Sequence, residues 1–355
     1  MAYTTIDNPE LYFQTVIYTG NATARTITLD GDENMQPDLV WGKIRSEGQD
    51  HVLVDSVRGA TKQLYSSDGS AEQTESQGLT GFASDGFTLG THAYFNKNTA
   101  TYVAWNWLAG NSTSSNGDGS ITSTVSANTT AGFSIVSYTG TGSAATVGHG
   151  LSSTPELMIF KNRDRSANWV IYHHKLSATP QTSYIYFSTM GGRHSYTGFF
   201  NSTAPTSSVF SIGTDGDFNS SGEKMIGYCF NSVKGYSKFG SYTGNGNADG
   251  PFEHTGFKPA FIIIKQIGSD GENWWVYDNT RNTTNLVTKG LYPNANNAEV
   301  DYSGSSQMNL DFVSNGFKLR ASDGALNGSG SSYIYIAFAE NPFVTSGTKA
   351  AGTAR

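Results

Sequence analysis

The chain has 355 residues and a net charge of −7 at pH 7; only 14% of the residues are charged, whereas 13% are aromatic and 41 are glycine. Nucleic acid is disfavoured as a partner, because the sequence has no cluster of lysine or arginine that would displace counterions from phosphates. Apolar runs are too short to span a bilayer, the N-terminus lacks a signal-peptide pattern, and the single cysteine, Cys229, allows no disulfide within the chain. We therefore expect a soluble protein without a membrane-inserted segment, which assembles in a reducing cytosol or has a fold that needs no disulfide bonds.

Residues 1–11 are expected to form a short arm, since Asp7, Asn8 and Pro9 favour a turn that breaks any helix there. After this arm, a strand followed by a Tyr-Thr-Gly turn occurs three times in the chain. After each copy, a proline begins an apolar run that ends six residues later in a lysine. The three pairs are Pro37 and Lys43, Pro155 and Lys161, and Pro259 and Lys265. Such self-similarity at a fixed spacing indicates tandem structural units.

Each unit ends in a strand with one strongly apolar face, as the two-residue side-chain period of a half-buried strand requires. The three faces consist of Val103, Trp105 and Trp107, of Ile226, Tyr228 and Phe230, and of Ile334, Ile336 and Phe338. We predict that all three faces belong to the core.

The repeat divides the chain into six parts. They are an N-terminal arm at 1–11, repeat 1 at 12–110, a Ser/Thr/Asn-rich linker at 111–131, repeat 2 at 132–233, repeat 3 at 236–343 and a flexible tail at 344–355. Within the linker, Ile121, Ser123 and Val125 alternate as an edge strand would. The short connection between repeats 2 and 3 predicts that these two pack rigidly, with repeat 1 apart from them.

Many short strands, regularly spaced turn residues and almost no helical period predict an all-β fold. We expect three tandem antiparallel β-sandwich domains of jelly-roll or lectin-like type. Repeat 1 diverges from the other two, because its segment Asp-Ser-Val-Arg-Gly-Ala-Thr-Lys at 55–62 has no close copy later in the chain.

Candidate metal ligands lack the spacing that a metal site needs. His173 and His174 are adjacent, but no further ligand stands at a zinc-binding spacing, so we predict no metal there. Glycine-rich turns hold Asp215, Asp217, Asp270 and Glu272. Calcium remains an alternative for these acids, although turn chemistry explains them without an ion. The sequence contains no phosphate-loop, esterase or zinc-protease motif, so we predict no cofactor and no enzyme activity.

Aromatic residues are the remaining functional candidates. Trp169, Trp274 and Trp275 lie beside Asn168 and Asn273, a combination that would stack on a sugar face and bond its hydroxyl groups. The alternative is core packing, because Trp169 and Trp275 each share a strand face with another apolar residue, whereas Trp274 points the other way.

The repeated motifs together resemble a known family. Besides the Tyr-Thr-Gly turn and the run from proline to lysine, the resemblance is carried by the segments at 55–62, 78–87, 236–244 and 337–343. They are similar to repeat proteins encoded by marine tailed phages, which are called tail-fibre or virion structural proteins. The resemblance covers about residues 4–343 and implies a place in a virus particle, but it brings no catalytic residue.

A member of that family is expected to be a non-enzymatic virion component made in the host cytoplasm. It would contact other virion proteins through its N-terminal region, form a homo-oligomer, most simply a trimer, and touch host surface polysaccharide as a tail fibre or appendage. One alternative is a decoration protein (head fibre) on the capsid. An alternative from another class is a polysaccharide-degrading glycosidase, which requires two carboxyl groups about 5–10 Å apart in one cleft.

Overall fold

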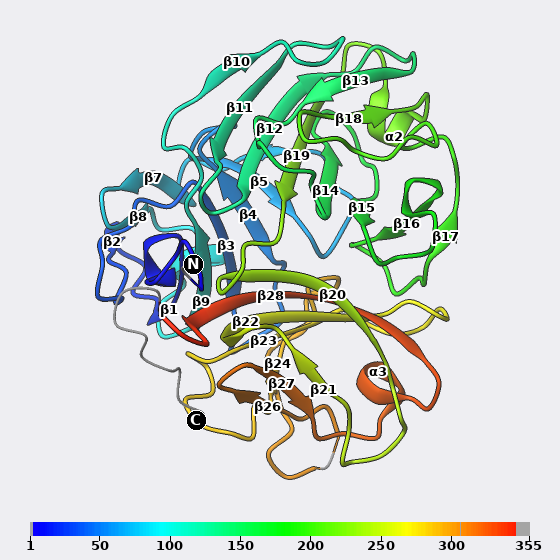
Figure 1. Cartoon of the computed structure of the whole chain (residues 1–355). Coiled ribbons are helices and arrows are strands. Elements are labelled where there is room, and N and C mark those ends of the chain that lie inside the picture. Colours follow the sequence, from blue (N-terminus) through cyan, green and yellow to red (C-terminus); the bar gives the residue numbers. More distant parts are fainter. Residues whose placement is uncertain (1–2, 306, 346–355) are drawn as a thin grey trace.

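The computed structural model describes residues 3–305 and 307–345 (Figure 1). Strands account for 41% of the structure and helices for 5%, and the strands form several antiparallel sheets. The prediction of a mostly β, antiparallel fold is therefore confirmed. Within the described ranges, no helix is long and apolar enough to cross a membrane.

Repeat 1 forms a six-stranded sheet in the order β1-β9-β3-β4-β5-β6 and a three-stranded sheet in the order β2-β8-β7. A short 3-10 helix, η1, precedes β1, and the helix α1 precedes β9. The bounds are η1 (Pro9–Leu11), β1 (Phe13–Thr19), β2 (Arg25–Ile27), β3 (Leu39–Ile44), β4 (Val52–Asp55), β5 (Lys62–Tyr65), β6 (Gln73–Thr74), β7 (Leu79–Ala83), β8 (Gly86–Leu89), α1 (Ala93–Asn96) and β9 (Thr101–Trp107).

Repeat 2 contributes to an eight-stranded sheet in the order β10-β11-β12-β19-β14-β15-β16-β17 and forms a two-stranded sheet of β13 and β18. The bounds are β10 (Ser114–Asn116), β11 (Ser123–Asn128), β12 (Phe133–Thr139), β13 (Ala145–Gly148), β14 (Leu157–Asn162), β15 (Val170–His173), η2 (Pro180–Thr182), β16 (Ser183–Tyr186), β17 (His194–Ser195), β18 (Val209–Ile212), α2 (Gly216–Asn219) and β19 (Lys224–Phe230). Residues 111–131, expected to be a linker, thus include β10 and β11. The alternating segment does contain a strand, but β11 pairs with both β10 and β12, so β10 forms the edge instead.

Repeat 3 forms a four-stranded sheet in the order β20-β28-β22-β23, a three-stranded sheet in the order β21-β27-β26, and the pair β24 and β25. The bounds are β20 (Ser237–Thr243), β21 (Phe252–His254), β22 (Phe257–Gln266), β23 (Trp275–Asp278), β24 (Lys289–Gly290), β25 (Val300–Asp301), β26 (Leu310–Val313), β27 (Gly316–Leu319), α3 (Gly324–Asn327) and β28 (Ser332–Pro342).

The three larger sheets share one arrangement. The closing strand (β9, β19 or β28) lies between the strand of the Tyr-Thr-Gly repeat (β1, β12 or β20) and the strand that carries the repeated lysine (β3, β14 or β22). A four-residue helix stands before each closing strand and ends in a fully buried asparagine, which is Asn96, Asn219 or Asn327.

These asparagines hold the three helices by the same hydrogen bonds, which sequence reasoning had missed. In repeat 1, Asn96 Nδ2 donates to the carbonyl groups of Thr23 and Gly90 at 2.7 and 2.8 Å, and Asn21 N–H donates to Asn96 Oδ1 at 3.0 Å. Asn219 and Asn327 make the matching bonds in repeats 2 and 3. A buried amide with all these partners satisfied fixes the turn after the first strand to the helix.

Both faces of each larger sheet are buried. One face packs on the smaller sheet of its own repeat, in a separate apolar cluster for each repeat. The other face joins a single cluster to which all three repeats contribute, and this cluster contains the three predicted apolar faces of β9, β19 and β28. The prediction that these faces belong to the core is confirmed. Because repeat 1 shares this cluster, the expectation that it sits apart from repeats 2 and 3 is wrong (Figure 1).

Aromatic side chains from all three repeats meet inside this shared core. The ring of Phe338 in repeat 3 lies 5.6 Å from Trp107 in repeat 1 and 5.8 Å from Phe230 in repeat 2, measured between centroids. Phe13 stacks on Phe338 at 5.4 Å. Such rings bury large apolar areas and contribute most of the energy of a core.

The N-terminal arm also packs on the body of the protein from residue 3 onward. Ile6 lies in the shared core, and Tyr3 Oη donates to the carbonyl of Gly256 in repeat 3 at 2.7 Å. The predicted flexible tail lies mostly outside the described residues, which end at Thr345.

Candidate functional site: the junctions between the repeats

The three repeats meet pairwise at three junctions, which we call junction 1–2, junction 1–3 and junction 2–3 after the repeats they join. Corresponding strands supply the contacts at each junction. The buried tryptophans that immediately precede β15 and β23 show the pattern: Trp169 Nε1 of repeat 2 donates to Tyr65 O of repeat 1 at 2.7 Å, and Trp274 Nε1 of repeat 3 donates to Tyr186 O of repeat 2 at 3.1 Å. The junctions therefore repeat in cyclic order around the shared core.

The repeated lysines are buried at these junctions. The exposed fractions of Lys43, Lys161 and Lys265 are 0%, 1% and 0%, and their ammonium groups donate to backbone carbonyl oxygens. Lys43 reaches Asn296 O of repeat 3 at 3.5 Å, and Lys265 reaches Met190 O of repeat 2 at 3.3 Å. Burial lowers the pKa of Lys43 to about 7 and those of Lys161 and Lys265 to about 8.

Junction 1–2 is closed by a buried ionic network. The Arg58 guanidinium lies 2.5 Å from Asp55 Oδ2 and 3.3 Å from Glu72 Oε2, and the side chains of Asp55 and Arg58 are fully buried. From repeat 2, Arg163 pairs with Glu72 at 2.8 Å, and Tyr228 Oη donates to Asp55 Oδ2 at 2.7 Å. Burial would raise the pKa of Glu72, but the hydrogen bonds and charges of Arg163 and Arg58 lower it below its usual value.

Junction 1–3 carries a second copy of this network. Asp278 and Arg281 of repeat 3 pair at 2.5 Å with both side chains fully buried, and Glu299 bridges Arg281 at 3.1 Å and Arg45 of repeat 1 at 2.8 Å. Trp105 Nε1 donates to Asp278 Oδ2 at 3.0 Å, in the place that Tyr228 takes at junction 1–2. The Asp-x-x-Arg unit of the segment 55–62 therefore does have a counterpart, at 278–281, which corrects the expectation that this segment is unique.

Junction 2–3 lacks the network although its backbone frame is the same. The backbone N–H of Arg193 donates to Ile267 O, as those of Glu72 and Glu299 donate to Arg163 O and Arg45 O. An arginine therefore replaces the bridging glutamate, and Ile267 replaces the arginine that pairs with it.

Two further replacements complete the difference at junction 2–3. His173 stands where the other junctions have Asp55 and Asp278, and Leu176 stands where they have arginine. His173 Nδ1 accepts from Lys175 N–H at 3.1 Å, so Nε2 carries the proton and donates to Tyr335 O at 3.3 Å. Burial, with a smaller effect of His174, lowers the pKa of His173 to about 3.

A cleft of about 330 Å³ opens beside this junction. Lys175 and Arg193 line it together with the hydroxyl-bearing residues Ser177, Ser241, Thr243 and Ser332, and none of the described residues that line it is acidic. An adjoining groove of about 630 Å³ shares Lys175 and is lined also by Glu156, His174 and Glu253. Burial raises the pKa of Glu253, against the lowering effect of Lys238.

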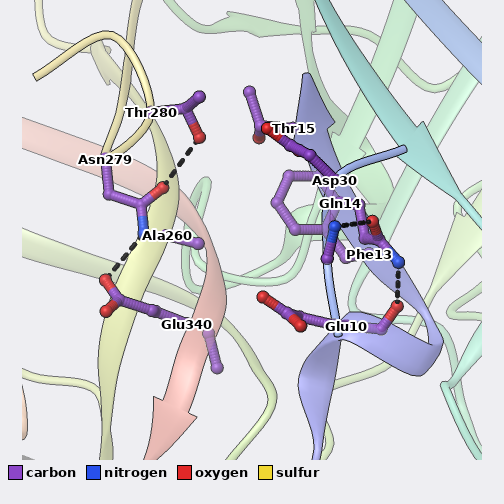
Figure 2. Close-up of a pocket in the computed structure, with 11 residues that line it drawn as sticks. Glu10, Phe13, Gln14, Thr15, Asp30, Ala260, Asn279, Thr280 and Glu340 are labelled. Atoms are coloured by element: carbon purple, nitrogen blue, oxygen red, sulfur yellow. Dashed lines mark hydrogen bonds between the residues drawn. The ribbon is translucent and has the colours of Figure 1, made fainter. Parts of the chain in front are cut away.

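A different cleft, of about 230 Å³, lies between β1 of repeat 1 and strands β22 and β28 of repeat 3. Figure 2 shows Glu10 and Glu340 on its opposite walls. Glu340 pairs with Lys258 at 2.8 Å and accepts from Asn279 Nδ2 at 2.6 Å, so its charge is compensated within the protein. Gln14 bonds Glu10 O and Gly31 N, which fixes the floor of the cleft.

The indoles of the sequence-predicted glycan contacts are buried. Trp169, Trp274 and Trp275 are 0%, 1% and 3% exposed; the first two belong to the shared core and Trp275 to the separate core of repeat 3. Asn168 and Asn273 are half-buried, and their side-chain oxygens accept hydrogen bonds from Ser188 Oγ and Asn294 Nδ2. The indoles of Trp169 and Trp274 therefore connect neighbouring repeats, whereas that of Trp275 packs inside repeat 3.

The acidic turn residues act as hydrogen-bond and ion-pair partners of other groups of the protein. Asp215 caps α2 by accepting from Asp217 N–H at 2.8 Å, Asp217 pairs with Arg165 at 3.1 Å, and Asp270 accepts from Gly192 N–H at 2.7 Å. Among residues 3–305 and 307–345, no group of three or more His, Cys, Asp or Glu side chains is placed to hold a metal ion.

Comparison with known proteins identifies a family without a described activity. The family model described as "Domain of unknown function (DUF7483)" matches residues 8–342, so the chain belongs to this family. No curated protein and no solved structure matches the chain significantly.

Proposed function

We propose that this member of the DUF7483 family is a non-enzymatic structural component of a tailed-phage particle: a tail fibre or appendage protein that contacts host surface glycans. The motifs that resemble virion structural proteins span nearly the same residues as the family match over 8–342. The observation that supports the proposal best is the shared core, because three repeats that bury their aromatic residues in one cluster behave as one stiff body. An appendage between a particle and a host surface needs that stiffness.

Within this proposal, each repeat is one antiparallel β-sandwich domain of jelly-roll or lectin-like type. Its larger and smaller sheets face each other across the separate apolar cluster of the repeat. The expected partners are other virion proteins and copies of the same chain, with a trimer favoured. Since residues 3–11 pack on the body of the protein, the surface around the arm rather than a free arm would dock to the particle.

The location of the protein on intact particles tests this proposal. Immunogold labelling with an antibody to residues 132–343 should place gold at the tail tip or fibres, as seen by electron microscopy. Gold spread over the head would instead identify a capsid decoration protein and overturn the appendage role. Particles that lack the label altogether, with the protein present in infected cells, would overturn both virion roles.

A glycosidase is the second candidate, and one observation favours it. The groove at junction 2–3 is lined by Glu156 and by Glu253, whose pKa is raised by burial, as a general acid requires. Glu156 accepts from Ser232 Oγ at 2.5 Å and lies 3.5 Å from His174. Release of reducing ends from host polysaccharide by the purified chain, abolished in Glu253→Gln and kept in Glu75→Gln, would establish this function; equal absence of release in all three proteins would exclude it for that polysaccharide.

A further inference from the structure

Lys175 and Arg193 are two cations at junction 2–3 without an anionic partner among the described residues. Both are exposed, neither forms a salt bridge there, and the Arg193 side chain donates only through Nη1, to Leu176 O at 3.0 Å. At the other two junctions, the residue that matches Arg193 is a glutamate whose carboxylate is held by two arginines. At junction 2–3 this position therefore carries an exposed cation instead of a paired carboxylate.

The cleft beside these cations has the size and lining of a small-molecule site. Its volume of about 330 Å³ falls in the range of ligand pockets and would admit one sugar ring. Hydroxyl groups of Ser177, Ser241, Thr243 and Ser332 line it, and these groups both donate and accept hydrogen bonds. Ser177 already bonds Ser183 at 2.9 Å, so its position is fixed before a ligand arrives.

We propose that this cleft binds an anionic sugar unit, whose carboxylate or sulfate group pairs with Arg193 and Lys175 in the cleft lining. The Nε and Nη2 groups of Arg193 would donate to the anion, Lys175 would add a second charge, and the serine and threonine hydroxyls would bond the ring hydroxyl groups. The inference rests on the proposed contact with host glycans and narrows it to acidic polysaccharides.

Binding of three sugars to the purified full chain tests the inference. Isothermal titration calorimetry or saturation-transfer NMR with glucuronate, glucose 6-sulfate and glucose distinguishes a carboxylate from a sulfate and both from a neutral ring. We expect one or both charged sugars to bind and glucose to bind at least tenfold more weakly. Equal affinity for glucose and the two charged sugars, or no binding of any of the three, would overturn the inference.

Variants locate the binding in the cleft. Arg193→Gln and Lys175→Gln should each weaken binding about tenfold or more, because each removes a charge-assisted hydrogen bond. Lys224→Gln, at an exposed lysine outside the cleft, is the matched control and should bind as the wild type does. Unchanged affinity in both cleft variants would overturn the assignment of the site.

A second design guards against loss of folding. Arg193→Glu combined with Ile267→Arg rebuilds the glutamate–arginine pair of the other junctions, so the protein should stay folded and lose binding of the charged sugars. Retained binding in this double variant would contradict the inference.

Gold at the tail with no sugar binding would refute only this inference, whereas sugar binding with gold on the head would refute only the host-contact role.

Discussion

Junctions 1–2 and 1–3 differ from junction 2–3 in side chains, while the backbone frame is the same. All three use the backbone N–H bond made by Glu72, Glu299 or Arg193. Two of them add a buried Asp-Arg-Glu-Arg network, and the third has His173 and Leu176 in the corresponding positions. Sheet pairing and the apolar core are therefore common to the three junctions, whereas the ionic network can be replaced by other side chains. Where the network is absent, a cleft with two available cations remains.

The largest effect is expected from breaking one network. Arg58→Ala leaves the carboxylate of Asp55 buried without its main partner and should lower the free energy of unfolding by about 3–5 kcal/mol. Leu176→Ala at junction 2–3 removes only apolar contacts and should cost less, about 2–3 kcal/mol. Urea unfolding of both variants measures the difference, and a loss below about 1 kcal/mol for Arg58→Ala would show that the network adds little.

The second prediction uses pH to separate the junctions. The pKa of His173 is about 3 in the folded protein and about 6.5 in the unfolded chain, so the unfolded state takes up a proton first as the pH falls. Stability should therefore fall from about pH 6.5 downward, by at most about 2.7 kcal/mol at pH 4.5. The networks act in another window: the lowered pKa values of Glu72 and Glu299 preserve their stabilisation until the pH falls below about 4.5.

His173→Gln should reduce this acid sensitivity, as measured by urea unfolding at pH 7.5 and pH 4.5. Part of the sensitivity should remain, because burial also lowers the pKa of His51. His254→Gln, at an exposed histidine, is the control and should behave as the wild type does. An identical pH dependence of His173→Gln and the wild type would contradict the assignment.

The smallest predicted effect tests whether the backbone frame is equally strong at two junctions. Trp169→Phe and Trp274→Phe each remove one indole hydrogen bond to a tyrosine carbonyl of the neighbouring repeat, and each also leaves a small void. We expect similar losses of about 1–2 kcal/mol in the two variants, from thermal or urea unfolding. A much larger loss for Trp169→Phe would show that the network at junction 1–2 depends on its indole.

Local patterns in the sequence determined the strand content and the repeats. The alternation of Val103, Trp105 and Trp107 predicts a buried strand face, because side chains of a strand alternate with a period of two. The spacing from Pro37 to Lys43 likewise aligns the three copies. The burial of the lysines does not follow from this spacing, because one of the carbonyl oxygens that accept hydrogen bonds from Lys43 belongs to Asn296 in another repeat.

Only the tertiary structure decided how the repeats close on one another and where the candidate site lies. The bridging residues stand at unequal distances along the chain: Glu72 is 14 residues from Arg58, Glu299 is 18 from Arg281, and Arg193 is 17 from Leu176. No fixed sequence pattern therefore aligns them. The two strand faces of the larger sheets also look alike in sequence, because both are apolar, and only packing assigns one to the smaller sheet and the other to the shared core.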